Sequence, residues 1–229
     1  MRFTKLRPDT FERLQLNAGI LIGDTPAHYL QDEKDSNDEH VFDTLEKLAN
    51  ATYNDLLGAT TGGITFEATP EYTDFGEDID NCPANMKELK RLDSWEVTMG
   101  GTFVMCDPSL VARLIGSADI VDTDAPSNKT MYRSCITPRD LAQEDFINVW
   151  WIGDYGSDNS EPESANNEGG GYLAIHMYNA LSTGGFHFTS ADGEKGTFEF
   201  EFTAHYSMEE QDMVPFTVYI GSGNIEDPV

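Results

Sequence analysis

Two runs of residues in the N-terminal half alternate between apolar and polar side chains, which is the period of a β-strand. In the first run, every second residue from Ile64 to Tyr72 is apolar, and the residues between them are Thr or Glu. A second run with one apolar-lined face extends from Trp95 to Met105. An acidic, proline-containing segment, residues 73–92, separates the runs and is too long for a tight hairpin turn. The pattern predicts two strands that each turn one face toward a core, joined by a long inter-strand loop.

The composition favours one β-rich domain spanning residues 1–229. A chain of 229 residues can bury a substantial core, and all-β domains often reach this size. Its 13 Phe, 9 Tyr and 3 Trp favour strands, and they argue against the disordered chain that its acidity would otherwise indicate. Three widely spaced cysteines, Cys82, Cys106 and Cys135, fit free thiols in a reducing cytoplasm. We find no secretion signal and no run approaching the roughly 18 apolar residues of a membrane span.

The charge balance excludes several classes of partner. The chain has 41 Asp and Glu against 14 Lys and Arg, a formal net charge of −27. Affinity for nucleic acid depends mainly on basic side chains that neutralise phosphates, so such a surface repels free DNA and RNA. An anionic membrane would repel it for the same reason.

Further strands are expected along the chain, with one well-marked helix. Their ranges are 14–22, 131–136, 146–155, 171–181, 186–188, 197–208 and 214–220. Residues 146–155 are nearly continuously apolar, which predicts a strand that is buried on both faces or lies at a subunit contact. Asp107 followed by Pro108 is typical of a helix start, and Gly116 is a possible end. The polar ranges 119–129 and 156–170 are expected to be loops.

Residues 28–55 form an acidic insertion. We expect a solvated loop over residues 32–39 and a short amphipathic helix over residues 41–50, because apolar residues recur there at helical spacing. The alternative is an acidic disordered segment. Residues 1–13 and 224–229 are expected to be extended N-terminal and C-terminal arms.

Signatures of catalysis and cofactor binding are scarce, and neither an enzyme nor a cofactor is expected. The chain has no phosphate-binding or dinucleotide-binding glycine motif, no nucleophile elbow and no zinc-binding H-E-x-x-H. Gly62-Gly63 and Gly184-Gly185 are expected in turns, and His176 and His205 as half-buried strand residues. Two acidic groups could supply oxygens to Ca²⁺, but neither has EF-hand spacing, and solvated loops are the favoured interpretation. These groups are Asp74, Glu77, Asp78, Asp80 and Asn81, and Asp119, Asp122 and Asp124.

Three phrases resemble the major tail tube protein of long-tailed bacteriophages and prophages, the siphovirus-like kind above all. They are ATTGG at residues 59–63, TPEYTDFGEDIDN at residues 69–81, and the WEV and GTF of residues 95–103. The resemblance covers the first half by wording and the second half by pattern. It implies a mainly β fold, a β-sandwich or half-barrel of the phage tail tube type with one or two short helices and extended terminal arms.

The resemblance also implies a function. Six copies would close into a ring in which four inner strands of each copy merge into one continuous barrel of 24 strands. Stacked rings would form an anionic conduit in the virion tail, assembled in the host bacterial cytoplasm, through which DNA passes without specific binding. The other partners implied are the tape measure, tail terminator and distal tail proteins, and no membrane. The arms and the loop over residues 73–92 would bridge successive rings.

Two sets of site residues follow from this hypothesis. Polar-face acids of the alternating strands are candidates for the lumen, with outward-facing solvent as the alternative: Glu67, Glu71, Glu199 and Glu201. Candidates for contacts between subunits are a basic cluster and a pair of aromatic residues: Lys87, Lys90, Arg91, Trp150 and Trp151. The expected core contains Phe66, Tyr72, Trp95, Phe103, Phe198, Phe200 and Phe202.

Two other functions stay open. One is a Ca²⁺-dependent carbohydrate-binding β-sandwich in which Trp150, Trp151 and Tyr155 stack on sugars. The other is the tube protein of a phage-derived particle, such as a bacteriocin or an injection system.

Overall fold

The computed structural model describes residues 15–23, 57–76, 79–83, 85–123, 133–155 and 171–221. The fold is mainly β, as predicted, with one α-helix and one 3₁₀ turn in these ranges. The expected terminal arms, the acidic insertion and the loop over residues 156–170 lie outside the described residues. No helix in the described ranges has the length and apolar character needed to cross a membrane.

The elements follow one another along the chain as a series of strands interrupted by the helix. They are β1 (Gln15–Gly23), β2 (Thr60–Asp74), β3 (Lys90–Phe103), α2 (Pro108–Ile115), β4 (Ala118–Thr123), β5 (Arg133–Pro138), η3 (Gln143–Asp145), β6 (Ile147–Tyr155), β7 (Gly171–Ser182), β8 (His187–Thr189), β9 (Thr197–Ala204) and β10 (Phe216–Gly221).

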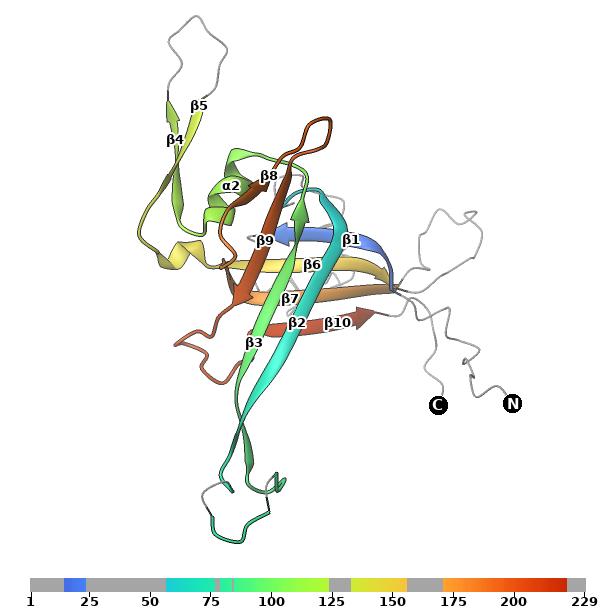
Figure 1. Ribbon diagram of the computed structural model, residues 1–229, viewed down its shortest axis with the longest axis vertical. Coiled ribbons are helices and arrows are strands. Elements are labelled where there is room, and N and C mark those ends of the chain that lie inside the picture. Colours follow the sequence, from blue (N-terminus) through green and yellow to red (C-terminus); the bar gives the residue numbers. More distant parts are fainter. Residues whose placement is uncertain are drawn as a thin grey trace, which may run out of the picture.

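Eight strands form one antiparallel sheet in the order β1-β6-β7-β9-β3-β2, with β10 also paired to β7 and β8 to β9. Strand β7 changes partner along its length: Met177 lies opposite Phe216 of β10, whereas Ala180 lies opposite Ala204 of β9. Asn179, between these two positions, has a left-handed φ of 48°. The sheet therefore folds over at β7 into two layers, β1-β6-β7-β10 and β2-β3-β9-β8, whose strands cross at a large angle in Figure 1.

The core lies between the two layers and is built by the predicted alternation. From the β2-β3-β9-β8 layer, Val97, Met99 and Phe103 are fully buried, and Phe103 stacks on Phe200 at a centroid distance of 4.3 Å. From the other layer, Ile147, Val149 and Trp151 of β6 enter the same cluster. The helix α2 covers one end of the sandwich with Leu110 and Leu114.

Helix α2 begins and ends where the sequence predicts. The Asp107 carboxylate accepts a hydrogen bond from the Leu110 N–H at 2.9 Å, and Pro108 occupies the first turn. Gly116 ends the helix with a φ of 91°, a conformation that favours glycine. Ser182 of β7 donates its hydroxyl to the Leu114 carbonyl at 2.9 Å, which ties the helix end to the sheet.

Several predicted boundaries are wrong. Residues 119–123 are not loop but most of strand β4, which pairs with β5 in a separate two-stranded sheet. Strand β3 starts at Lys90, so the connection after β2 is shorter than the predicted range 73–92. Gly62 and Gly63 lie inside β2, where their positive φ values accompany a register shift rather than a turn.

Two of the expected strand and core residues are also placed differently. Tyr72 is 53% exposed because it lies where the β2–β3 ribbon extends beyond the body, so it is not a core residue. Strand β9 ends at Ala204 rather than near Met208. Beyond that point the Tyr206 hydroxyl accepts the Trp95 N–H at 2.9 Å and replaces a strand partner.

His176 is fully buried, not half-buried, on the outer face of the β1-β6-β7-β10 layer. Its imidazole stacks on Trp150 at a centroid distance of 3.7 Å and lies 4.0 Å from the Tyr178 ring. Among the residues that the structure describes, neither ring nitrogen of His176 has a hydrogen-bond partner, and the Trp150 Nε1 has none either. Burial lowers the pKa of His176 from 6.5 to about 3, because the charged form would lose its hydration without gaining a partner.

We expect His176 to make the protein less stable as the pH falls. Below pH 6.5 the unfolded chain binds a proton that the folded chain does not bind until about pH 3, so the stability present at neutral pH is lost across that window. Between pH 7.5 and pH 5 the free energy of unfolding should fall by about 2 kcal/mol more in the wild type than in His176→Phe. Urea unfolding at a series of pH values measures this difference. Parallel pH profiles for the two proteins would contradict it.

Candidate functional site: an acidic sheet face and two projecting hairpins

The outer face of the β2-β3-β9-β8 layer is polar and acidic. The four glutamates predicted from the alternation all lie on it: Glu67, Glu71, Glu199 and Glu201. Their cross-strand partners are Thr98, Ser94, Thr102 and Gly100, which alternate with the core residues of β3. The register adds Glu96, which lies opposite Thr69. The sequence analysis missed this residue, although its position between two core residues of the second run was a sufficient signal.

Threonines separate the glutamates, and the row formed by Glu67, Thr98 and Thr203 is an example. Lys90 and Arg91 lie at the outer end of β3, beyond the register shift near Tyr72, and no Lys or Arg occurs in residues 60–71, 94–103 and 197–204, which carry the glutamates. None of the five glutamates takes part in an ion pair among the residues that the structure describes. Their charges therefore remain uncompensated and repel one another and any other anion.

The layer that carries the acidic face has two open edges. Strand β2, of 15 residues, pairs with β3 on one side, and its other edge has no strand partner within the described ranges. At the opposite side, the edge strand β8 is only three residues long. Unpaired N–H and C=O groups on such edges can accept a strand from another chain. As far as the structure describes the chain, the layer thus consists of four strands, β2, β3, β9 and β8, and both of its outer edges are open to extension.

The β2–β3 hairpin projects from the body at one end of the molecule (Figure 1). We define its outer part, residues 72–92, as the tip. Asp74 organises the turn by accepting the N–H groups of Gly76 and Asn85, both at 2.9 Å. These hydrogen bonds lower the pKa of Asp74, so the carboxylate stays charged and continues to accept both N–H groups of the turn. Asp74 therefore has a structural role; Glu77 and Asp78 of the same predicted Ca²⁺ group lie outside the described residues.

The three predicted contact bases lie on this tip, but only Lys87 lies in the loop. Lys90 and Arg91 are strand residues of β3, facing Asp74 and Thr73 across the ribbon. The Lys87 and Arg91 side chains are 90% and 72% exposed, and their ion pairs with described residues are local, with Glu88 and Asp93 respectively. Such exposed pairs contribute little to stability and leave both bases accessible to a partner.

The second projecting hairpin is made of β4 and β5, which we call the arm. Arg139, directly after β5, fixes its base with a bidentate pair to Asp145 at 2.7 and 2.8 Å and a bond to Asp119 at 2.8 Å. These hydrogen bonds raise the pKa of Arg139. Burial alone would raise the pKa of Asp145, but the bonds from Arg139 and from the Ala142 N–H outweigh it and lower the pKa. Asp119 is thus committed to an ion pair; the side chains of Asp122 and Asp124 lie outside the described residues.

Trp150 and Trp151 are not on a surface. They are 1% and 9% exposed, one on each face of β6, and Trp151 donates its Nε1–H to the Ala18 carbonyl at 2.9 Å. The strand is thus buried on both faces, which was one of the two interpretations of its continuous apolar run. The prediction that these two residues contact a neighbouring subunit is wrong, because both side chains are covered within one subunit. The same burial removes both rings as platforms for a sugar.

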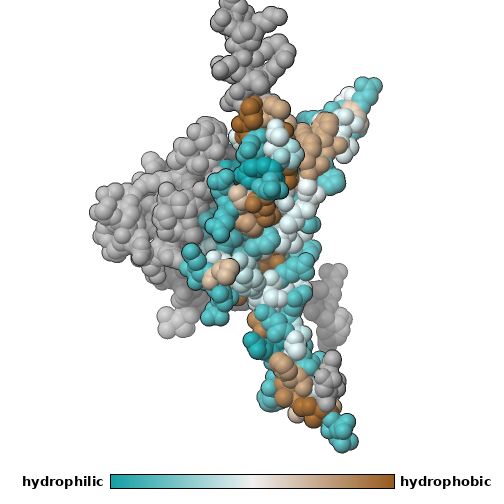
Figure 2. Space-filling model, turned by 90° about the vertical axis from the view of Figure 1, so that its left-hand side faces the viewer, coloured by the Kyte–Doolittle hydropathy of each residue, from teal (hydrophilic) through white to brown (hydrophobic). Residues whose placement is uncertain are grey.

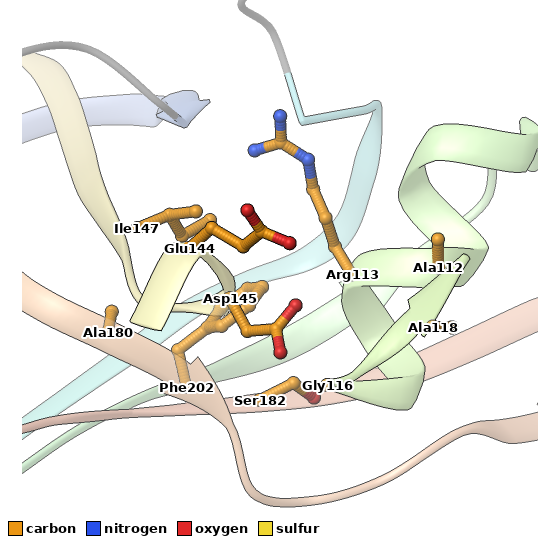
Figure 3. A pocket seen from close by; sticks show the side chains of 10 residues that line it. All are labelled: Ala112, Arg113, Gly116, Ala118, Glu144, Asp145, Ile147, Ala180, Ser182 and Phe202. Carbon is orange, nitrogen blue, oxygen red and sulfur yellow. The ribbon is translucent and has the colours of Figure 1, made fainter. Parts of the chain in front are cut away.

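One cavity of about 120 Å³ lies between α2 and η3. Figure 3 shows Arg113 from the helix on one side and Glu144 and Asp145 on the other. Its volume suits a few water molecules and is smaller than the roughly 300 Å³ at which small-molecule sites begin. No group of three or more potential metal-binding side chains occurs in the part of the chain that the structure describes.

A scan against models of known protein families finds no match for this chain, and a search of the curated proteins finds none either.

We expect partial neutralisation of the acidic face to stabilise the subunit at low salt. In Glu199→Gln/Glu201→Gln, two like charges that are neighbours on one face of β9 are removed, which relieves their repulsion. The urea midpoint should rise in low salt, and the difference should vanish in 1 M NaCl, where the Debye length is about 3 Å. Glu209→Gln/Glu210→Gln, in the exposed connection between β9 and β10, changes the net charge equally and is the matched control. An equal shift in the control would show that net charge alone is responsible.

Proposed function

We propose that this chain is a structural virion protein that assembles into stacked rings of six copies and so forms a phage tail tube. The single observation that carries the proposal is the four-stranded layer with a polar, acidic outer face and with two edges that have no strand partner among the described residues. A sheet of this kind is incomplete in one copy, and it becomes closed when neighbours extend it from both sides. The sequence resemblance supplies the prior expectation of a tube.

The dimensions of such a barrel suit double-stranded DNA. Four strands from each of six copies, about 4.8 Å apart and tilted by roughly 40°, give a circumference of about 150 Å and a diameter of about 48 Å. Side chains that point inward would leave somewhat under 40 Å. A duplex roughly 20 Å wide would pass with a layer of water on each side.

The charge of the acidic face would let the inner wall of the tube repel DNA. A ring would carry 6 × −27 = −162 formal charges. With the acidic face turned inward, each copy would add five uncompensated glutamates to the bore, which repel phosphates. A basic wall would instead bind DNA through many contacts and retain it.

The β2–β3 tip is suited to link successive rings. It extends beyond the body along the strand direction and carries exposed Lys87 and Arg91 on an otherwise acidic chain. The expected terminal arms would add to these contacts. The remaining proposed partners are the tape measure, terminator and distal tail proteins, and the proposed location is the virion tail. A tube of a phage-derived particle would use the same surfaces.

Tube formation is the direct test of this proposal. Purified protein at high concentration and raised salt, which screens the repulsion between copies, should form uniform hollow tubes in negative-stain electron microscopy. Protein that stays monomeric over a wide range of concentration and salt would count against the function.

The orientation of the acidic face has its own test. The substitution Glu199→Cys is made in a variant without native cysteines. Its thiol should react with a maleimide-bearing reagent protein, wider than the bore, while this chain is monomeric. The same thiol should be protected from the reagent after tubes form. Asp212→Cys, in the exposed connection before β10, is the matched control and should react in both states. Equal reactivity of Glu199→Cys in tubes and monomers would place the acidic face on the outside.

A further inference from the structure

The two layers of the sandwich are offset, so each layer has core-facing side chains that the other does not cover. Their strands cross at a large angle, and the ends of β6, β7 and β10 reach beyond the edge strand β2 in Figure 1. At the other edge of the β2-β3-β9-β8 layer, β8 is the outermost strand within the described ranges. The surfaces beside these two edges, at β2 and at β8, both expose apolar side chains.

The surface beside β2 is formed by β10 where that strand leaves the cover of the other layer. Phe216, at the start of β10, contacts Phe66 of β2 at a centroid distance of 5.7 Å. Val218 and Ile220 point to the same side of β10 as Phe216, because side chains alternate along a strand, but they are 44% and 61% exposed. Ile220 lies roughly 13 Å beyond Phe216 along the strand, which takes it past β2. We call Val218 and Ile220 the shelf. Their strand partners on β7 are two residues that pack against the main core: Ile175 and Leu173.

The surface beside β8 carries two phenylalanines on the core-facing side. Phe188 of β8 and Phe186, just before it, both contact the ring of Phe198, at centroid distances of 4.9 and 5.8 Å. Phe198 is 7% exposed, whereas Phe188 and Phe186 are 54% and 43% exposed. Figure 2 views the molecule from the left of Figure 1 and shows apolar side chains exposed near the top of the described surface. Large exposed apolar groups on a chain with a net charge of −27 mark a contact surface.

The two surfaces complement each other in position. A neighbour that extends the acidic layer beyond β2 would bring its own β8 edge to that place, about 4.8 Å from β2. The core-facing side of the added strand would then lie over the shelf, as β2 itself lies over Phe216. Phe186 and Phe188 are the side chains that a second copy offers on that side. Each edge of one copy therefore carries the apolar group that the opposite edge of the next copy leaves uncovered.

The apolar area suits a contact between copies. A phenylalanine side chain buries roughly 150 to 250 Å² when it is fully covered, so two half-exposed rings have about 200 Å² left to bury. This is about a quarter of the roughly 800 Å² that each partner buries in a standard interface, before the shelf and the pairing of strand edges are added. Copies with a net charge of −27 repel one another, and apolar burial is an attraction that does not depend on charge.

We propose that Phe186 and Phe188 of one copy pack on the shelf of the next copy in the same ring. The hydrophobic core would then continue from copy to copy behind the acidic wall. The contact joins two different surfaces, so it is heterologous and closes when the ring is complete. This inference rests on the proposed function and assigns the side chains that hold neighbouring copies together.

Substitutions on the two surfaces test the contact, because these side chains are largely exposed in a single copy. Phe186→Ser and Ile220→Ser should each raise the lowest protein concentration that forms tubes at least tenfold. Met208→Ser is the matched control, since Met208 is 88% exposed and lies in the connection between β9 and β10, and it should leave that concentration unchanged. Urea unfolding of each variant checks that the subunit remains folded.

Cross-linking tests whether the two surfaces meet. The substitutions Phe186→Cys and Ile220→Cys are combined in a variant without native cysteines, and the protein is treated with a short bismaleimide under tube-forming conditions. A denaturing gel should show a ladder that ends at six copies. The control combines Phe186→Cys with Met208→Cys, which keeps the number of thiols but removes the one on the shelf, and it should give no species above the dimer.

The outcomes separate this contact from the proposed function. Tubes of the Phe186→Cys/Ile220→Cys variant without the ladder, or unchanged tube formation by both serine variants, would reject the contact and leave the tube function standing. If the cysteine pair itself prevents tubes, the concentration series of the serine variants decides. Wild-type protein that forms no tubes would reject the function and this contact with it.

Discussion

The packing of one sheet face against the other layer is the constraint on which the rest of the structure depends. Val97, Met99 and Phe103 are fully buried, and Phe198, Phe200 and Phe202 of β9 close the same face. Because side chains alternate along a strand, fixing these residues inward fixes every residue between them outward. A slip of one residue would bury glutamates and expose phenylalanines. The hydrophobic core therefore determines where the uncompensated charges of the molecule lie.

The same constraint explains which parts of the fold the sequence could predict. The strands with clean alternation and the helix with an Asp-Pro start were located correctly, because burial and capping are local signals. The run around Trp150 was correctly predicted as a strand, but an apolar run is compatible with both a doubly buried strand and an interface. Only the three-dimensional arrangement decides that both indoles are covered by this chain.

The errors also have physical causes. Strand β4 is part of a solvated ribbon, so no burial pattern marks it, and its acidic residues resemble those of a loop. Tyr72 continues the apolar alternation of β2 but lies beyond the facing layer, where the Lys90 ammonium, 4.8 Å from its ring centroid, covers it only in part. Lys90 and Arg91 are in a strand because β2 and β3 keep pairing past a register shift near Tyr72, which no local pattern announces. For the candidate site, the sequence located four of the five acids on the face, and the alternation of the second run also indicates Glu96, which lies between Trp95 and Val97.

Strand β7 has a mechanical consequence. It is hydrogen-bonded to β6 along one side and, on the other, first to β10 and then to β9. The two walls of the sandwich therefore share a continuous backbone instead of being held by side chains alone. Neither layer can separate from the other without breaking main-chain hydrogen bonds of the shared strand. The described body should therefore unfold in a single cooperative step, and a force applied to one layer should be transmitted directly to the other.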